Sequence, residues 1–301
     1  MTAASADPSH SAKHATAHGV LCGAGSALFW ALGFVAARHG VLSGMSPLVL
    51  ALHRFVWPGL ALVPIAVAGR GGAKDLGGVG WRHGLILTFF GGLPLALLSY
   101  FGYVYVPLGH GAVIQPSCAA VGGLILARLL LGEPLPARRV VGAVVIVAGL
   151  GVIGAEALRT MGRNGIAGDF LFVGAGSFFA VFGVLLRRWH IAPMRAAAVT
   201  SALSLAGLPL LLFSLDNMLA AGFLENLLQA VVQGLFAGAG AIYLFTRAVV
   251  LLGAGRAVVF PSLVPPFTLL IGFLTLGEVP SLAQLIGLVI VVVGFRLTQK
   301  G

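Results

Sequence analysis

Residues 112–117 (Ala-Val-Ile-Gln-Pro-Ser) recur 145 positions later as residues 257–262 (Ala-Val-Val-Phe-Pro-Ser). The same register continues through a Leu-Gly-Glu triplet at residues 131–133 and again at residues 276–278. Single glycines then match in this register, Gly142 with Gly287 and Gly149 with Gly294. Because a proline and a glutamate are among these dispersed identities, we interpret them as a duplicated unit rather than as chance similarity in an apolar sequence.

The composition is that of a polytopic membrane protein. Of the 301 residues, 59% are apolar and 9% are charged, whereas soluble domains carry about 25% charged residues. No soluble fold of this size could bury so much apolar surface, which excludes a cytosolic enzyme, a nucleic-acid module and a disordered protein. The net charge of +10 does not indicate nucleic-acid binding, because Lys and Arg occur singly or in pairs between apolar runs, where they fix membrane orientation.

The predicted fold class is an all-α membrane protein of ten transmembrane helices arranged as two inverted five-helix repeats. A spanning helix needs about 20 apolar residues, and Gly and Pro separate ten such runs near 18–37, 46–68, 83–103, 107–131, 138–155, 166–187, 194–213, 227–249, 255–276 and 280–298. Residues 1–17 are expected to form a disordered cytoplasmic tail, residues 18–155 the first repeat and residues 166–298 the second. Five is an odd number, so the second repeat enters the membrane from the opposite side. Inverted repeats of this kind are typical of secondary transporters, whose two halves exchange roles.

The basic residues predict the orientation. An even number of spans puts both termini on one side, and most Lys and Arg residues fall on that side, whereas Arg38, Arg159 and Arg163 fall on the other. Since cytoplasmic loops carry the excess of Lys and Arg, both termini are expected to be cytoplasmic.

The repeated motifs resemble a known family. The Pro-Ser of the fourth and ninth spans, the Leu-Gly-Glu after each and the Gly-rich span that follows are similar to the drug/metabolite transporter superfamily, in its ten-span class with two EamA-type repeats. Phe29, Trp30 and Gly33 of the first span and Arg54 of the second also resemble that pattern. The resemblance implies export of amino acids or related metabolites from a bacterial inner membrane through a cavity between the halves. The aromatic residues expected near this cavity resemble those of YddG-like amino-acid exporters.

Two cations lie within the second predicted span. Polar groups in the bilayer are expensive and are functional candidates by default, so His53 and Arg54 are predicted to contact a substrate carboxylate or to line an aqueous vestibule. The alternative for Arg54 is a structural cation bonded to helix-end carbonyl oxygens.

Aromatic and hydroxyl side chains supply further candidates for the substrate cavity. Trp30 and Ser26 share a face of the first span, because they are spaced by four. Buried Tyr and Trp combine apolar area with a hydrogen bond, and the remaining candidates of this kind are Tyr100, Tyr103, Ser177, Phe178 and Tyr243. Ordinary packing or an interfacial aromatic belt is the alternative, above all for Tyr103.

The repeated prolines predict flexible points. Proline inside a helix removes a backbone hydrogen bond, so Pro116 and Pro261 are expected to be helix breaks and hinges for rocking between states. Gln115 and Phe260 precede them and are predicted to meet the solute there.

Carboxylates are scarce within the predicted spans. No Asp or Glu lies deep within any of them, since Asp169 and Glu225 sit near the outer helix ends. This pattern favours a neutral or zwitterionic solute and permits facilitated diffusion. Glu133 and Glu278 are interpreted as structural residues that bond backbone donors at the start of the next helix.

The predicted function is export of small metabolites, most of all aromatic or other neutral amino acids, by alternating access. Export of drugs, cations or nucleotide-linked metabolites is the alternative. A membrane-embedded enzyme fits less well because the sequence has neither a nucleophile with a base nor a metal-binding motif. No catalytic residue, metal or cofactor is expected. The expected partners are the small-molecule substrate and the lipid bilayer, without nucleic acid, for a monomer or homodimer.

Overall fold

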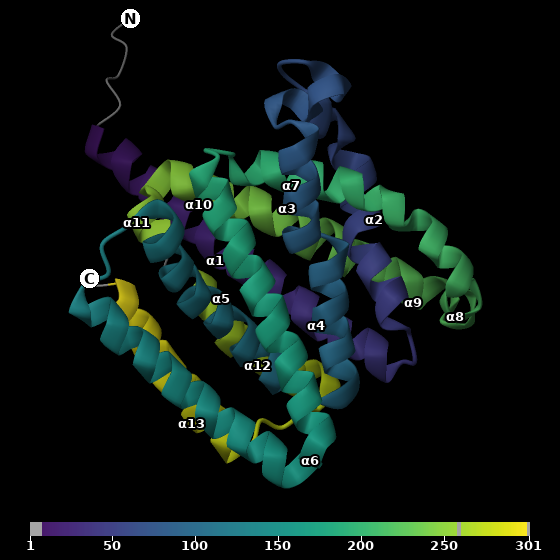
Figure 1. Cartoon of the computed structure of the whole chain (residues 1–301), viewed down its shortest axis with the longest axis vertical. Helices are drawn as coiled ribbons and strands as arrows, with labels where there is room; N and C mark the ends of the chain where they lie inside the picture. The colour runs from purple at the N-terminus through teal and green to yellow at the C-terminus, as the bar shows by residue number, and fades with distance from the viewer. Residues whose placement is uncertain (1–7, 258–259, 300–301) are drawn as a thin grey trace, which may run out of the picture.

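The computed structural model of the chain describes residues 8–257 and 260–299, and its regular elements there are all helices (Figure 1). In chain order they are α1 (Pro8–Leu42), α2 (Pro47–Val67), η1 (Gly72–Gly78), α3 (Trp81–Gly91), α4 (Leu93–Tyr105), α5 (Leu108–Leu131), α6 (Ala137–Arg188), α7 (Pro193–Ser204), η2 (Leu205–Phe213), α8 (Leu215–Ala220), α9 (Gly222–Gln229), η3 (Ala230–Gly240), α10 (Ala241–Leu252), α11 (Ala254–Ala257), η4 (Phe260–Leu263), α12 (Val264–Leu276) and α13 (Leu282–Gln299). Of the four η elements, η3 is π-helical and the others are 3₁₀-helical.

Much of this helix is long and apolar enough to cross a bilayer. In the part of the chain that the structure describes, seven continuous helical runs qualify: Thr16–Leu42, Pro47–Val67, Trp81–Tyr105, Leu108–Leu131, Ala137–Arg188, Pro193–Phe213 and Gly222–Leu252. Two shorter apolar helices, Phe260–Leu276 and Leu282–Thr298, complete the chain. The protein is therefore a multi-pass helical membrane protein.

The longest helix, α6, is two arms joined at a glycine. Its 52 residues would extend far beyond a hydrocarbon layer about 30 Å thick. Gly162 has φ 61° and ψ −141°, a backbone conformation that is essentially restricted to glycine. The chain turns back on itself there, beside the α6 label at the bottom of Figure 1. Residues 137–161 and 163–188 thus correspond to the separate fifth and sixth runs of the sequence.

Several spans expected to be continuous are interrupted. Gly92, with φ −104° and ψ −143°, separates α3 from α4 within the third run. The eighth run contains the π-helical segment η3 between α9 and α10. The ninth contains the 3₁₀ segment η4, and α12 begins only at Val264, with prolines at its second and third positions. Proline is tolerated at the start of a helix because it lacks a backbone N–H.

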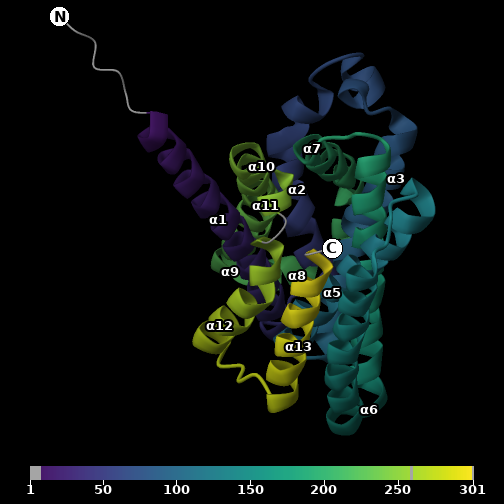
Figure 2. The ribbon, with the colours of Figure 1, turned by 90° about the vertical axis from the view of Figure 1, so that its left-hand side faces the viewer.

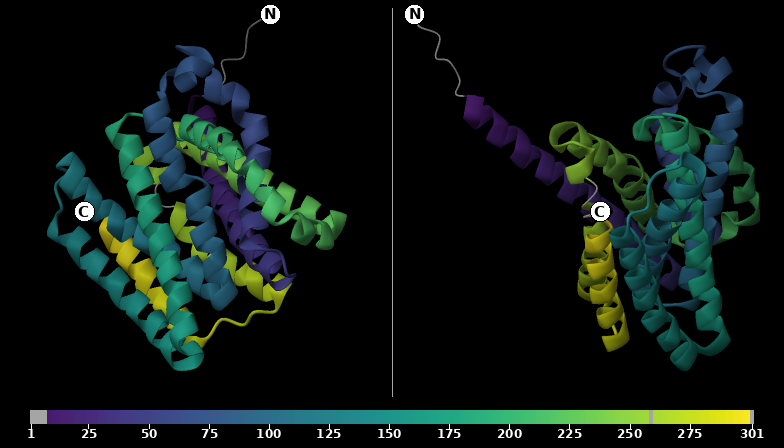
Figure 3. Two further views of the ribbon diagram at one scale, coloured as in Figure 1. Left: turned by 45° about the vertical axis from the view of Figure 1, so that its right-hand side comes forward. Right: turned by 60° about the vertical axis from the view of Figure 1, so that its left-hand side comes forward.

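The N-terminus differs from expectation. Helix α1 begins at Pro8, so the expectation of a disordered tail is wrong for residues 8–17, while residues 1–7 lie outside the described part. Figures 2 and 3 show the N-terminal part of α1 projecting away from the other helices.

The first arm of α6 packs against α13, beside it in Figures 1 and 2. A Cβ added to Gly142 would lie 2.8 Å from the Gly294 carbonyl oxygen, and one added to Gly149 would lie 2.9 Å from the Gly287 carbonyl oxygen. Side chains other than hydrogen would force the helices apart, so glycine permits this close approach, as is common between helices in membranes. These four glycines are the ones matched by the internal repeat.

Candidate functional site

Arg54 of α2 meets the backbone of η3 at Gln233. Arg54 is half-buried, and its Nη1 donates to the backbone carbonyl oxygen of Gln233 at 3.0 Å, a contact of the kind expected for a structural cation. Within residues 8–257 and 260–299, no carboxylate lies within ion-pair distance of Arg54. A guanidinium has five N–H donors, and a buried charge is costly without compensation. Arg54 can therefore still receive an anionic group.

Gln233 links three first-half helices to η3. Its Nε2 donates to the Gly33 carbonyl oxygen of α1 at 3.0 Å, and its Oε1 accepts from the Tyr100 hydroxyl of α4 at 3.0 Å. Gln233 is 1% exposed and Tyr100 is 6% exposed, so both hydrogen bonds are buried. Arg54, Tyr100 and Gln233 form what we call the central cluster. It contains two predicted substrate residues and one, Gln233, that the sequence analysis missed.

Both ring nitrogens of His53 are hydrogen-bonded to other side chains of the protein in this conformation. Its Nδ1 accepts from the Trp57 indole N–H at 3.0 Å, and its Nε2 lies 2.9 Å from Asn226 Oδ1. The Asn226 amide nitrogen donates to the Met218 and Gly222 carbonyl oxygens, which fixes Oδ1 as the acceptor for His53. An indole N–H can only donate, so this geometry assigns a neutral imidazole protonated on Nε2.

A second buried amide lies one helical turn before Gln233. Gln229 is fully buried, and its Nε2 donates to the Ala36 carbonyl oxygen at 3.0 Å and to Glu225 Oε1 at 2.8 Å. Glu225 Oε2 in turn lies 3.0 Å from His39 Nε2. Gln229 Oε1 has no hydrogen-bond partner among the described residues. Polar contacts thus follow the whole interface between α1 and the α9–η3 segment.

The candidates on α1 lie close to helices of the second half. The Trp30 ring lies 5.6 Å from the Phe245 ring, between centroids. Ser26 is fully buried, and its hydroxyl donates to the Gly23 carbonyl oxygen at 2.7 Å. The Phe260 ring packs directly on Gly23, because a Cβ added there would overlap it. Trp30, Ser26 and Phe260 therefore share the region around α1, but their side chains join no hydrogen bond of the central cluster.

Tyr103 and Gln115 both contact side chains of neighbouring helices. Tyr103 is fully buried, its ring packs edge-on to Phe172 at 4.8 Å, and its hydroxyl has no partner among the described residues. Gln115 Oε1 accepts from the Ser99 hydroxyl at 2.9 Å. Helix α5 runs through Pro116 as one helix, whereas Pro261 lies in the 3₁₀ segment η4.

Three candidates lie away from the central cluster. Ser177 is exposed, and its hydroxyl donates to the Val173 carbonyl oxygen of its own helix at 2.8 Å. Phe178 packs with Phe89 and Phe90 at 5.4 Å and 5.1 Å. Tyr243 is 54% exposed. None of the three is brought next to Arg54 in this conformation.

One end of the bundle is held by an ion pair between the two halves. Arg38 at the end of α1 donates from Nε to Glu278 Oε1 at 2.6 Å and from Nη1 to the Tyr103 carbonyl oxygen at 2.6 Å. Glu278 Oε2 accepts from the Leu108 backbone N–H at 2.8 Å. Glu278 does bond a helix-start donor, as expected, but the helix is α5 of the other half rather than the one that follows. We call this the Arg38 end; in Figure 1 its α12–α13 loop is at the bottom.

The opposite end carries the matching pair. Arg187 Nη1 lies 2.9 Å from Glu133 Oε1, and these side chains are 49% and 38% exposed. Those of Arg38 and Glu278 are only 14% and 22% exposed. The pair at the Arg38 end is therefore the more buried of the two.

A buried imidazole–carboxylate pair lies between α5 and the second arm of α6. His110 is fully buried and Asp169 is 8% exposed, and His110 Nδ1 lies 2.8 Å from Asp169 Oδ1. Asp169 lies close to the start of the second arm, near a helix end as the sequence indicated, and its side chain is buried inside the helix bundle. His110 carries no motif signal, so its pairing with Asp169 was not foreseen.

The fold and this polar interior define a class of protein, namely multi-pass helical transporters of small molecules. The sequence profile of the EamA-like transporter family matches residues 17–155 and again residues 166–298. The chain therefore belongs to the EamA-like transporter family, of the drug/metabolite transporter superfamily.

Relatives agree with this assignment. The chain is 29% identical over 279 residues to a protein of Archaeoglobus fulgidus described as an uncharacterized transporter, and the match covers 90% of this chain and 95% of that one. A crystal structure described only as that of a protein superposes with a TM-score of 0.58 at 19% identity, covering 95% of this chain and 96% of the other. The latter shows a shared fold.

Proposed function

We propose that this protein exports small carboxylate-bearing metabolites, neutral amino acids foremost, by alternating access between two inverted five-helix repeats. The observation that carries the proposal is the central cluster, in which a half-buried guanidinium, with no carboxylate partner among the described residues, lies beside a buried tyrosine and amide. The proposed repeats are residues 18–155 and 166–298.

Ten membrane crossings follow from the helical runs if two adjustments are made. Gly162 divides α6 into two crossings, and the two shorter apolar helices add two more to the seven long runs. Successive helices then alternate in direction. The proposal requires an odd number of crossings in each repeat, which this division provides.

Two sets of contacts support the inversion. Gly142 approaches Gly294 while Gly149 approaches Gly287. The repeat matches Gly142 with Gly287 and Gly149 with Gly294. Gly142 thus contacts the repeat equivalent of Gly149, and Gly149 contacts the repeat equivalent of Gly142. This is the pattern expected for two equivalent antiparallel helices related by a two-fold axis.

The ion pairs follow the same pattern. Glu133 and Glu278 are matched by the repeat, and each pairs with an arginine at the end of the first helix of the other repeat. The two pairs lie at opposite ends of the bundle. We propose that they open in turn. Both pairs are formed in this conformation, and we take the Arg38 end, whose pair is the more buried, as the more firmly closed one.

The chemistry of the central cluster supports a carboxylate-bearing solute. Arginine binds carboxylates in a planar, two-bond geometry, and Tyr100 and Gln233 provide neutral polar groups beside it. The apolar and aromatic surroundings suit a neutral side chain, and Trp30 and Phe260 are proposed to line the path along α1, as in YddG-like exporters. A cationic drug would find the Arg54 charge repulsive. A nucleotide-linked solute would need more cations than Arg54 alone provides.

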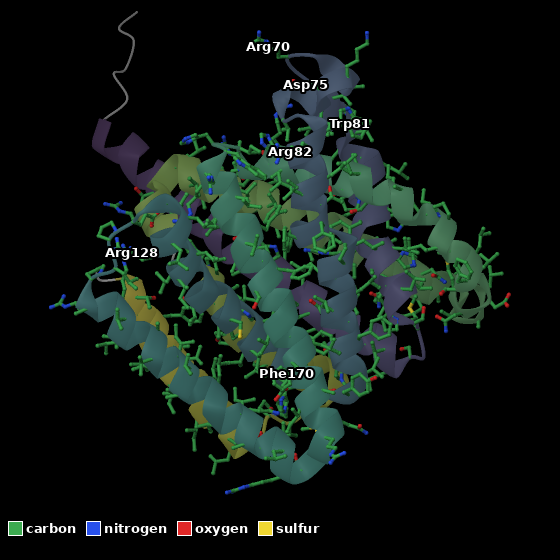
Figure 4. The ribbon with its side chains drawn as sticks, viewed as in Figure 1. Arg70, Asp75, Trp81, Arg82, Arg128 and Phe170 are labelled. Carbon is green, nitrogen blue, oxygen red and sulfur yellow. The ribbon has the colours of Figure 1, made fainter. Side chains whose placement is uncertain are left out.

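The proposed location is a bacterial inner membrane with both termini in the cytoplasm. The exposed side chains of Arg70 and Arg82 lie together at the top of Figure 4, the end opposite the Arg38 end, and Phe170 lies in the lower half. Cytoplasmic loops carry such basic residues, so the Arg38 end faces outward. The protein is proposed to work as a monomer or homodimer.

The test is counterflow, the exchange of labelled for unlabelled solute, in proteoliposomes that contain the purified protein. The panel holds the twenty amino acids, a polyamine, a dye cation and a nucleotide sugar. We expect saturable counterflow of neutral amino acids and none of the dye or the nucleotide sugar. Arg54→Gln should abolish it and Arg54→Lys should retain part, whereas the exposed control Arg82→Gln should behave as wild type. Counterflow of the dye or nucleotide sugar alone, or unchanged kinetics in Arg54→Gln, would refute the proposal.

A further inference from the structure

The pair His110–Asp169 lies in a buried site with unsatisfied polar atoms. Their facing atoms, Nδ1 and Oδ1, are 2.8 Å apart, but His110 Nε2 and Asp169 Oδ2 have no partner among the described residues. The Tyr103 hydroxyl is a third buried atom without a partner, and a Cβ added to Gly111 would lie 2.6 Å from it. Native structures pair most buried polar atoms, so the Nε2 and Oδ2 atoms of the pair are candidates to bind a small partner such as a proton.

The number of protons on the pair sets its charge. With one proton, held in the hydrogen bond, the pair is an aspartate and a neutral imidazole with net charge −1. With a second proton, on Nε2 or on the carboxyl group, the net charge is zero. An apolar interior disfavours an uncompensated charge. Each proton bound or released therefore changes the charge buried at the pair by one.

Ionisable groups on this side of the molecule come from α4, from α1, from the loop before α13 and from the first arm of α6. Tyr103 of α4 supplies a neutral hydroxyl, and Arg38 and Glu278 compensate each other beside Leu108. Glu156, on the first arm of α6, lines the cavity beside Leu108, and Glu225 pairs with His39. Among the described residues, neither member of the His110–Asp169 pair forms an ion pair with a lysine or arginine, so the charge of the pair changes with each proton.

A cavity at the Arg38 end approaches this site. A cavity of about 410 Å³ is lined by Leu108 and Gly109, the residues just before His110, together with Arg38, Glu278 and Glu156. Glu156 Oε2 is itself buried without a partner among the described residues. A cavity of this size that charged side chains help to line can hold water, and its lining ends one residue before His110.

We propose that His110–Asp169 is the proton-binding site of this transporter, loaded from the Arg38 end and emptied on the opposite side as solute moves outward. One proton binds the pair and one leaves in each cycle, so the pair returns to its starting charge and no other bond changes. This inference rests on the proposed function and adds solute–proton antiport to it. The scarcity of carboxylates in the sequence permitted facilitated diffusion, and the proton site takes the place of that alternative.

The first test separates proton coupling from solute binding. Proteoliposomes are assayed with an amino acid that wild type exchanges, once by counterflow without a pH gradient and once by accumulation that an imposed pH gradient drives. Asp169→Asn and His110→Gln should keep counterflow within about twofold but lose gradient-driven accumulation by roughly tenfold or more. The exposed control Asp216→Asn should keep both. Retained accumulation in both site variants, or wild type that exchanges but never accumulates, would overturn the proposal.

A second test needs no solute. Infrared difference spectra of the purified protein between acid and alkaline pH should contain carboxyl and imidazole bands that both site variants lack and Asp216→Asn retains. Spectra identical to wild type in Asp169→Asn and His110→Gln would overturn the proton site. A panel without any counterflow would count against the proposed function, and the infrared comparison would then decide the proton site by itself.

Discussion

The ion pair at the Arg38 end allows a quantitative prediction. Glu278 accepts two hydrogen bonds, from Arg38 Nε at 2.6 Å and from the Leu108 backbone N–H at 2.8 Å. The substitution Glu278→Gln keeps the shape of the side chain, but the amide has one acceptor oxygen and no charge. One of the two hydrogen bonds and the ion pair with Arg38 are therefore lost. Hydrogen bonds to charged groups contribute about 1.5–3 kcal/mol. A loss of about 2 kcal/mol would shift the closed-to-open ratio at this end by roughly 30-fold.

The matched control is Glu133→Gln. Its pair with Arg187 is 38% and 49% exposed, and exposed ion pairs contribute only about 0–1 kcal/mol. The shift at that end should therefore stay below roughly fivefold.

Cysteine labelling measures this shift. The reporter is Ala37→Cys, a fully buried position beside Arg38, in a protein whose Cys22 and Cys118 are replaced by Ala. Opening at the Arg38 end exposes the new thiol to a membrane-impermeant maleimide. Glu278→Gln should raise the labelling rate severalfold or more, up to the full shift in the closed-to-open ratio. Glu133→Gln should not raise the labelling rate. Equal rates in the two variants would refute the assignment of the Arg38 pair as the closed gate.

Three further outcomes are expected. Tyr100→Phe removes a buried hydrogen bond to Gln233, so counterflow kinetics should change by about 1–3 kcal/mol of apparent free energy. Tyr243→Ala changes an exposed side chain, so the same counterflow assay should show no change in solute preference. Gly149→Val should lower the thermal unfolding midpoint in detergent, because overpacking costs about 1–3 kcal/mol; Gly151→Val, where a Cβ meets nothing within 4 Å, should lower it less. A larger loss for Gly151→Val would contradict the tight α6–α13 contact.

The sequence predicted the helical membrane architecture because apolar runs and a duplicated register are properties of the chain itself. The interruptions at Gly92, in η3 and in η4 were not predicted, since glycine and proline occur throughout these runs and only packing decides which of them break a helix. Gln229 and Gln233 were missed although their signal was present. With Asn226, they are amides spaced by three and four within an apolar run, on one helix face.

Arg54 and Tyr100 were found because charges and aromatic residues stand out in an apolar sequence. Their partner could not be named, since Gln233 lies more than a hundred residues further along the chain. The same is true of Arg38 and Glu278, which are 240 residues apart. The repeat marked both glutamates as equivalent but gave no reason to pair each with the opposite half.

The π-helical segment Ala230–Gly240 carries Gln233 at the contact with Arg54. A π turn holds more residues than an α turn, so this segment contains spare backbone within a helix that otherwise runs from Gly222 to Leu252. If it tightens to α-helical geometry, every side chain that follows rotates about the helix axis while those before it stay in place. Tightening of this kind, if it accompanies loss of the contact between Arg54 and the Gln233 backbone carbonyl oxygen, would turn α10 relative to α9.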